Sequence, residues 1–484
     1  MLTGMSQTVT DAGGRVKISM SDDNRHEQSL NGVHIHMIGI GGSGMCGLAQ
    51  IAVQCGALVT GSDRAPSPAT DHLHAMGVEI RYDQQAGWIP PGTQWVICSA
   101  AVGHDNPERR TAGERHLKIL KYSEMLGRVM QFKRGVAIAG THGKSTTTAM
   151  TAWILTTAGL DPSFVGGAVI PQLGGSSRGG EGEHFVVEAC EFDRSFLNFS
   201  PSMAVVLNVE PDHLDYYKDI NEILSAFCQF IARVHPDGLV LIPADSPHRQ
   251  TLSAAAAAPV QTFGFDPAAD ISAQNCLLVG GCPAFDVVFQ GRELGRVQLR
   301  VPGKHNILNA LAAAGLALRA GAAWDMVCRA LSSFGGIERR SELIGQVAGV
   351  TLVDDYAHHP TEIKATLAAL KARWQPKRLI CVFQPHQHSR TRCFMDEFAH
   401  SFGDADLVIV PDIHFARDTP SDEAGVKAVM LVEKIQAAGG VAIHLPHFTE
   451  VIEYLQAHHQ AGDLIISMGA GSVWKVTHEL AKRI

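Results

Sequence analysis

At 484 residues, with 45% hydrophobic and 18% charged residues, the chain has the composition of a folded α/β protein of about three domains, which excludes a disordered protein. Its net charge of −8 and pI of about 6.3 indicate no basic face for nucleic acid. The ten cysteines form no C-x-x-C pair, and the longest apolar run, near Ala310 to Leu318, is too short to span a bilayer. We therefore expect a cytoplasmic protein with reduced thiols and no membrane insertion.

The first recognisable unit follows a polar, aperiodic stretch at residues 1–31, which we expect to be a flexible leader. The sequence predicts a strand at His34–Ile40, a small-residue helix at Met45–Val53, and between them the G-x-G-x-x-G turn of Gly39–Gly44. Such a turn binds a diphosphate, because backbone N–H groups and the helix N-terminus face the anion.

Two further strands add polar side chains to the same edge. A strand at Val59–Asp63 ends in an acid about 20 residues past the glycines, where a carboxylate meets a ribose hydroxyl. A strand at Val96–Ala101 brings Ser99 to the expected crevice. These patterns predict a nucleotide-diphosphate site, and they do not separate NAD from other nucleotides.

The strongest motif lies at Val136–Thr148, where an apolar run breaks at Gly140 and leads into a helix. This is a phosphate-binding loop, in which Lys144 reaches the β- and γ-phosphates and the Ser145 hydroxyl ligates magnesium. Ile138 stands where the generic pattern has a glycine, so the loop is a shorter variant. A second phosphate site also argues against a dehydrogenase, which has no evident use for one.

Acids and a histidine follow the next two strands. The strand at His184–Ala189 delivers Glu188 and Glu191 to its carboxyl end, and the strand at Met203–Val209 leads into a polar loop centred on His213. Single groups of this kind are usually surface residues. Three of them beside a phosphate loop predict a metal site, because open α/β sheets bind ligands at that edge.

A helix opens at Pro302–Asn309 and is rich in alanine. Asn306 and Asn309 lie three residues apart on one face, where their amides can face a base. The alternative is an ordinary capped helix.

The remainder predicts a second Rossmann-like unit. Two of its loops are dense in polar groups, at Asp354–Pro360 and Gln384–Arg392, and a glycine turn closes the unit at 469–472. The expected strands are Val350–Val353, Arg378–Phe383, Asp406–Pro411, Val441–Leu445 and Asp463–Ser467.

Taken together, these elements divide the chain into four segments. They are the leader (1–31), a Rossmann-like nucleotide-binding domain (32–131), a central P-loop domain (132–336) and a Rossmann-like C-terminal domain (337–484).

Eight ordered motifs resemble those of the Mur ligases of bacterial cell-wall synthesis. They are GIGGSGM, AGTHGKSTTT, EACE, NVEPDHLD, GKHNILNA, ERR, VDDYAHHP and FQPHQHSRT, and they span about residues 34 to 475. The resemblance implies a three-domain α/β enzyme in which the first domain holds UDP, the second ATP and the third the incoming amino acid. The HHP and FQPH loops resemble the members that add the first amino acid, L-alanine.

The resemblance also implies roles for individual residues. The residues implied in catalysis are Lys144, Glu188, His213 and Arg340. The implied magnesium ligands are Ser145, Glu188 and His213. The implied ATP-binding residues are Gly140, Thr141, His142, Gly143, Lys144, Ser145, Thr146, Asn306, Asn309, Arg340 and Asp355. UDP is expected on Gly41, Gly42, Ser43, Gly44, Met45, Asp63 and Ser99, and the amino acid on Tyr356, His358 and Arg390.

Two positions depart from the family pattern. Cys190 stands where many relatives have an acid, and Gln387 stands where many alanine-adding relatives have an arginine. We expect Arg390 to be the main group for the amino-acid carboxylate.

The implied function is ATP- and Mg²⁺-dependent addition of L-alanine to the lactyl carboxylate of UDP-N-acetylmuramate through an acyl phosphate, by a monomer or homodimer. One alternative within the family is the recycling ligase that adds a whole tripeptide. Another, from a different class, is an NAD-binding oxidoreductase or sensor, which leaves Lys144, Glu188 and His213 without a role.

Overall fold

A computed structural model of the chain describes residues 8–10, 16–18, 30–84, 87–99, 102–416 and 418–484. Most of the expected leader lies outside these residues, as do Ala100 and Ala101 of one expected strand. Within the leader, β1 (Thr8–Thr10) pairs antiparallel with β2 (Val16–Ile18). No helix in the described part of the chain is both long enough and apolar enough to cross a membrane.

The first large sheet is five-stranded and fully parallel, in the order β5-β4-β3-β6-β7. Strand β3 ends at Ile38, two residues before the predicted end, because Gly39 (φ +77°) starts the turn. The strands are β3 (His34–Ile38), β4 (Leu58–Ser62), β5 (Glu79–Arg81), β6 (Trp95–Cys98) and β7 (Lys118–Lys121). The helices are α1 (Ser43–Gln54), α2 (Pro68–Ala75), α3 (Pro107–Glu114) and α4 (Tyr122–Met130).

The second sheet has ten strands in the order β10-β9-β11-β8-β12-β13-β14-β15-β16-β17. It is parallel from β9 to β15, and β10 and the pair β16–β17 add antiparallel edges. The strands are β8 (Arg134–Ala139), β9 (Ser163–Ile170), β10 (Gly175–Arg178), β11 (His184–Glu188), β12 (Met203–Val206), β13 (Leu239–Pro243), β14 (Val260–Gly264), β15 (Ile271–Val279), β16 (Cys282–Phe289) and β17 (Arg292–Gln298).

Helices cover both faces of this sheet. Side chains of β8 alternate between two cores, with Ala137 and Ala139 in one and Val136 and Ile138 in the other, as expected of a strand buried on both faces. The helices are α5 (Lys144–Thr157), α6 (Ile220–Ile231), α7 (Arg249–Ala255), α8 (His305–Arg319) and α9 (Trp324–Ser333), with 3₁₀ turns η1 (Pro171–Leu173) and η2 (Phe192–Asn198).

The third sheet has six strands in the order β18-β19-β23-β20-β21-β22, parallel except for β18. The strands are β18 (Glu342–Val347), β19 (Val350–Asp355), β20 (Arg378–Phe383), β21 (Leu407–Val410), β22 (Ala442–His444) and β23 (Asp463–Met468). The helices are α10 (Pro360–Trp374), α11 (His388–Cys393), α12 (Met395–Ala399), α13 (Pro420–Gly425), α14 (Ala428–Ala437), α15 (Phe448–His458) and α16 (Trp474–Leu480). The predicted α/β class with parallel, Rossmann-like sheets is confirmed.

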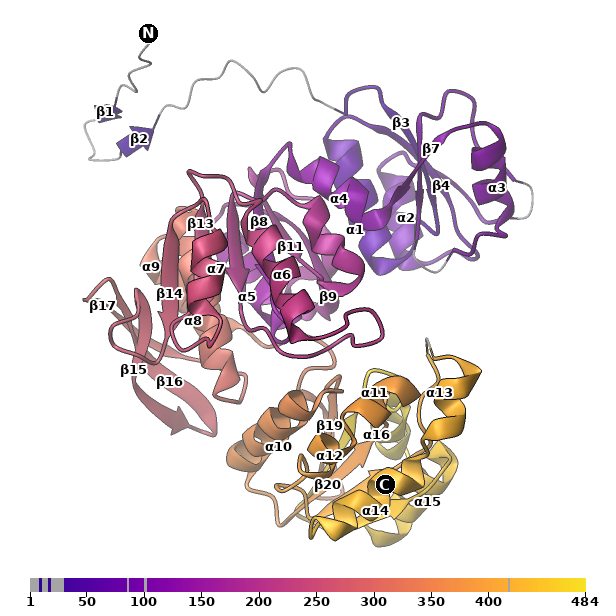
Figure 1. The fold of residues 1–484 in the computed structure, drawn as a ribbon, viewed down its shortest axis with the longest axis vertical. Coiled ribbons are helices and arrows are strands. Elements are labelled where there is room, and N and C mark those ends of the chain that lie inside the picture. The colour runs from indigo at the N-terminus through magenta and orange to yellow at the C-terminus, as the bar shows by residue number, and fades with distance from the viewer. Residues whose placement is uncertain (1–7, 11–15, 19–29, 85–86, 100–101, 417) are drawn as a thin grey trace.

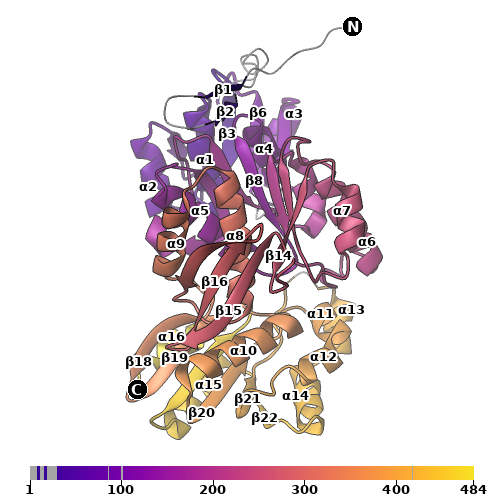
Figure 2. The ribbon, with the colours of Figure 1, turned by 90° about the vertical axis from the view of Figure 1, so that its left-hand side faces the viewer.

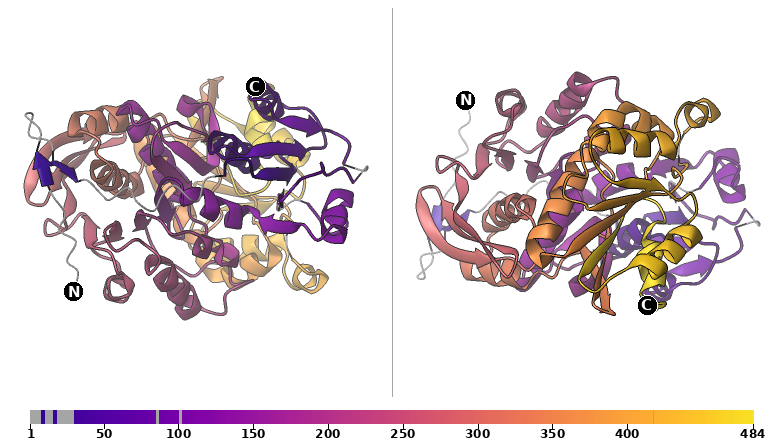
Figure 3. Two further views of the ribbon diagram at one scale, coloured as in Figure 1. Left: turned by 90° about the horizontal axis from the view of Figure 1, so that it is seen from above. Right: turned by 90° about the horizontal axis from the view of Figure 1, so that it is seen from below.

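The ten-stranded unit lies between the other two (Figure 1, Figure 2). The views along the long axis show the first unit at one end of the molecule and the third unit at the other (Figure 3). The turn between β15 and β16 touches the end of α10, where Arg373 donates to the Gly280 carbonyl at 3.3 Å. The carboxyl ends of β8 and β12 lead into loops that contact the start of α10, so the two units share a cleft there.

Candidate active site

The phosphate-binding loop joins β8 to α5. Gly143 has φ +82°, and a Cβ on it would lie 2.6 Å from Asn309 Oδ1 on α8, so any larger residue would clash. Helix α5 begins at Lys144, and the loop therefore points its backbone N–H groups and the helix N-terminus at one spot.

The Lys144 ammonium is buried at this spot. It donates to the carbonyls of Gly140 and Thr141 and lies 2.9 Å from a carboxylate oxygen of Glu191. Burial alone lowers the pKa of Lys144, but the Glu191 charge and hydrogen bond, together with the charge of Glu188, outweigh burial and raise the pKa, so the lysine is charged. The sequence placed Glu191 among the groups of a predicted metal site, and in the structure it forms an ion pair with Lys144.

The expected magnesium ligands lie in one cavity with Lys144. Ser145, Glu188 and His213 all line it, and a Glu188 oxygen accepts a hydrogen bond from the Gly167 N–H at 2.7 Å. Burial lowers the pKa of His213, and its Nδ1 is buried without a hydrogen-bond partner among the described residues. A hydroxyl, a carboxylate and a neutral imidazole with a free lone pair fit a divalent cation. Cys190 lines the same cavity, and burial raises its pKa to about 12, so it brings no charge.

A second cavity adjoins the loop and has apolar walls that include Phe263, Val301 and Leu308. The expected ATP residues that line it are His142, Gly143, Thr146, Asn306, Asn309, Arg340 and Asp355. Asn309 Nδ2 donates to Asn306 Oδ1 at 3.0 Å, and Asn306 Nδ2 donates to the Pro302 carbonyl at 2.7 Å. The two amides therefore contact each other, and they form part of a wall suited to a flat base.

Arg340 and Asp355 enter this cavity from the C-terminal side. Arg340 lines both cavities and lies 3.3 Å from Glu362 Oε1. The Asp355 carboxylate accepts from the N–H groups of Ser341 and Ala357, and burial raises its pKa to about 6. Among these contacts Glu362 was not expected from the sequence.

The expected UDP residues gather separately, at the carboxyl edge of the first sheet. The Gly41 N–H donates to Asp63 Oδ2 at 2.7 Å, and Ser99 packs against Gly39. Met45 is buried at the start of α1. The side chain of Ser43 lies outside the described part of the chain.

The expected amino-acid residues divide into two groups. Tyr356 and His358 line the Lys144 cavity, and burial lowers the pKa of His358 to about 4. Arg390 is not among the described lining residues of either cavity. Its Nε and Nη2 atoms lie 3.2 and 2.7 Å from Asp212 Oδ1, so it is held by a carboxylate that the sequence did not assign.

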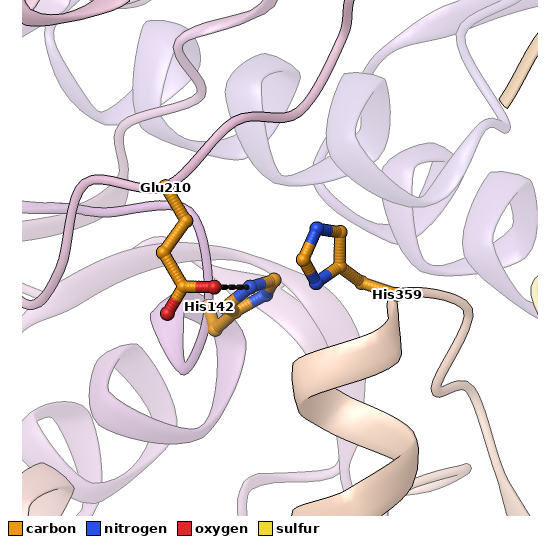
Figure 4. A group of neighbouring side chains, drawn as sticks. All are labelled: His142, Glu210 and His359. Carbon is orange, nitrogen blue, oxygen red and sulfur yellow. Dashed lines mark ion pairs between the residues drawn. The ribbon is translucent and has the colours of Figure 1, made fainter. Parts of the chain in front are cut away.

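A further cluster joins the two units at the cleft. His142 Nε2 lies 3.5 Å from Glu210 Oε2, and the His359 ring lies 4.6 Å from the His142 ring (Figure 4). On its other side, His142 Nδ1 lies 3.3 Å from Glu362 Oε1. Burial lowers the pKa of His142, but the two carboxylates outweigh it and raise the pKa to about 9. Ligand atoms of His142, Glu210 and His359 lie within 4.8 Å of one another, which is metal-ligand spacing. His359 already uses both nitrogens, toward the Pro211 carbonyl and the Thr361 N–H, so we assign the cluster to domain contact.

The two cavities thus gather most of the expected residues of the middle and C-terminal segments. Gly140 and Arg390 are the expected residues of this group that line neither cavity. The sequence analysis did not identify three carboxylates that pair with the expected site residues, namely Asp212, Glu210 and Glu362. Asp212 lay inside a quoted motif, but no spacing pattern connects it with a residue 178 positions away.

Three family models match the chain in order. The "Mur ligase family, catalytic domain" model matches residues 34–134, the "Mur ligase middle domain" model matches 138–317, and the "Mur ligase, glutamate ligase domain" model matches 339–471. They cover the three large sheets described above.

Individual relatives match over almost the whole chain. The chain is 43% identical over 447 residues to the UDP-N-acetylmuramate–L-alanine ligase of Clostridium novyi, covering 92% of this chain and 96% of that one. It is 42% identical over 455 residues to the ligase of the same name from Pelotomaculum thermopropionicum, covering 93% and 97%.

Solved structures agree with the sequence relatives. The UDP-N-acetylmuramate-alanine ligase of Thermotoga maritima has a TM-score of 0.75 at 27% identity, covering 93% of this chain and 98% of that one. A murein peptide ligase from Psychrobacter arcticus has a TM-score of 0.67 at 28% identity, with the same coverage.

Proposed function

Because the chain belongs to the Mur ligase family, we propose that it is an ATP-dependent ligase that adds L-alanine to the lactyl carboxylate of UDP-N-acetylmuramate, a step of peptidoglycan precursor synthesis. The observation that carries the proposal is the single cavity lined both by Lys144 of the phosphate loop and by Tyr356 and His358 of the C-terminal unit. A ligase needs this arrangement, since the activated carboxylate and the amine must meet.

The chemistry begins with a carboxylate that is a poor electrophile at neutral pH. Transfer of the γ-phosphoryl group of ATP to it forms an acyl phosphate, and the amine then attacks the carbonyl and releases phosphate. The charged Lys144 at the N-terminus of α5 stabilises the phosphate oxygens, and Arg340 adds a second cation at the junction of the two cavities.

Magnesium is part of the proposal. Ser145, Glu188 and His213 would hold it, and when bound it neutralises charge on the transferred phosphoryl group. Their shared cavity and the unpartnered Nδ1 of His213 support this assignment.

The remaining roles follow the division of the molecule. We assign UDP to the first unit (32–131), on residues 41–45 with Asp63 and Ser99. ATP belongs to the second unit (132–336), with Asn306, Asn309 and Asp355 around the nucleoside. The amino acid belongs to the third (337–484), on Tyr356 and His358 with Arg390 nearby. The ten unpaired cysteines support a cytoplasmic site of action. The proposal also includes a monomer or homodimer with no nucleic-acid or membrane partner.

The test is phosphate release from ATP with each substrate omitted in turn and with a panel of amino acids. We expect release only when both UDP-N-acetylmuramate and a free amino acid are present, with L-alanine best and glycine and L-serine weaker. A tripeptide that outperforms L-alanine would favour the recycling-ligase alternative. Binding of NAD without phosphate release would contradict the ligase.

A further inference from the structure

Asp212 is a buried carboxylate in the loop that follows β12, and its two oxygens differ. Oδ1 accepts three hydrogen bonds, from Arg390 Nε at 3.2 Å, from Arg390 Nη2 at 2.7 Å and from the His213 backbone N–H at 2.7 Å. Oδ2 lies 3.8 Å from His213 Nε2, and it receives no hydrogen bond from the described part of the chain. One acceptor is therefore saturated and the other is available.

Asp212 is a residue of the reaction cavity. Asp212 lines it together with Lys144, and Arg390 does not. The cavity lining therefore includes the Asp212 carboxylate, whereas its counter-ion, Arg390, is not among the lining residues.

The other carboxylates of this cavity are engaged or more exposed. Glu188 accepts from the Gly167 N–H and is assigned to magnesium. Glu362 contacts Arg340 and His142 and accepts from the His358 N–H. Glu338 is exposed to solvent. Asp212 is thus the buried anion of this cavity that still has an acceptor to offer.

An amino acid at neutral pH arrives with a positively charged ammonium group, which needs an anion at the place where it will become the attacking amine. We propose that Asp212 Oδ2 binds the ammonium group of the incoming amino acid, and that Arg390 is a positioning residue that holds Asp212. This inference rests on the proposed function, because it names the group that receives the amino acid in that reaction.

The competing explanation is that Asp212 stands in for the carboxylate of the amino acid and leaves Arg390 when the substrate binds. The side chains of Arg390 and Asp212 are only 7% and 8% exposed. Separating a buried pair leaves an unpaired charge at a cost of about 3–5 kcal/mol, so this exchange is unfavourable.

The experiment compares two nucleophiles in the full-length enzyme. Hydroxylamine is uncharged at neutral pH and traps the acyl phosphate as a hydroxamate. L-alanine, by contrast, must bind through its ammonium group before it can react. For Asp212→Asn we expect the KM for L-alanine to rise by about 30-fold or more, the loss of one charge-assisted hydrogen bond. Hydroxamate formation from ATP and UDP-N-acetylmuramate should stay within about threefold of wild type, because that step needs no ammonium site. The matched control is Asp215→Asn, an exposed acid of the same loop, with both activities near wild type.

Several outcomes would overturn the proposal. A fall in the KM for L-alanine would show that Asp212 competes with the substrate carboxylate. Equal loss of hydroxamate and alanine activity, or a changed Mg²⁺ requirement in the hydroxamate assay, would assign Asp212 to the fold or to the phosphoryl step. An equal rise in KM in Glu338→Gln would place the ammonium elsewhere. If wild type releases no phosphate with any amino acid, the proposed function fails as well, which distinguishes the two failures.

The positioning role of Arg390 has its own test. Arg390→Ala should raise the KM for L-alanine with little change in hydroxamate formation. The double variant with Asp212→Asn should be no worse than the more damaged single variant, because both remove the same interaction. If the two substitutions multiply each other's effect on the KM in the double variant, Arg390 contacts the amino acid itself. That result would overturn the positioning role.

Discussion

The turn proposed for UDP and the cleft proposed for ATP and the amino acid are built in different ways. In the first, Asp63 accepts from Gly41 only 22 residues away, and one sheet carries every part. In the second, Asp212 binds Arg390 across 178 positions and His142 meets Glu362 across 220. A site within one unit exists whenever that unit folds, whereas the cleft exists only when two units meet. Substitutions in the two places should therefore separate substrate binding from turnover.

The largest expected effect is that of Lys144→Ala. Removing the cation that faces the phosphates should lower ligation by about 10³-fold or more. Binding of UDP-N-acetylmuramate, measured by calorimetry, should change less than about twofold, because the proposed UDP turn lies in another unit.

A surface lysine provides the control. Lys371→Ala removes only an exposed ion pair with Asp404 and should leave both quantities unchanged. Parallel loss of substrate binding in Lys144→Ala would show that the two sites are not independent.

The same contrast explains what could be predicted from the sequence. The strand, glycine turn and helix around Gly41 and Gly143 are local patterns, so both turns could be located from the sequence. Phosphate binding at the two turns stays a prediction. None of the strands β13–β18 was expected; the outer half of β15, for example, is exposed and its sequence lacks a buried pattern. The partners of Arg390 and His142 could not be inferred from the sequence, because these contacts form only where two units pack against each other. No local sequence pattern indicates which residues meet there.

A second prediction concerns the cleft and contrasts two neighbours in the FQPH loop. Arg390→Ala should raise the alanine requirement by about 100-fold, because it leaves the buried Asp212 charge without its counter-ion. Gln387→Ala should raise it by only about threefold, since the buried Gln387 Nε2 has no hydrogen-bond partner among the described residues. The measurement is the KM for L-alanine at saturating ATP. Two equally mild effects would remove Arg390 from the amino-acid site.

A third prediction tests the turn proposed for UDP in the first unit. Asp63→Asn weakens the hydrogen bond that fixes the Gly41 turn, and it should reduce affinity for UDP-N-acetylmuramate about tenfold, or about 1.4 kcal/mol. Binding of ATP should not change. Asp71→Asn, an exposed acid in the first turn of α2, is the control. Loss of ATP affinity in Asp63→Asn would contradict a turn that works within one unit.

The smallest expected effect is on stability, a pH-dependent weakening of the contact between the two units through His142. The pKa of His142 is raised from 6.5 to about 9 by Glu210 and Glu362 against the opposing effect of burial, so its imidazolium links the two units. A raised pKa in the folded state gives stability that is complete below about pH 6.5 and disappears as the pH passes about 9. Glu210, whose pKa is lowered to about 2, stays ionised over that range.

The melting temperature of wild type should therefore exceed that of His142→Asn by a constant margin below about pH 6.5, and the margin should vanish by about pH 10. His184 is the matched control, because burial lowers its pKa and the sign reverses. Protonation of a buried neutral histidine costs stability as the pH falls, so His184→Asn should gain relative to wild type at low pH and change little at high pH. A margin for His142→Asn that persists unchanged at pH 10 would mean that packing against His359, and not charge, joins the two units at the cleft.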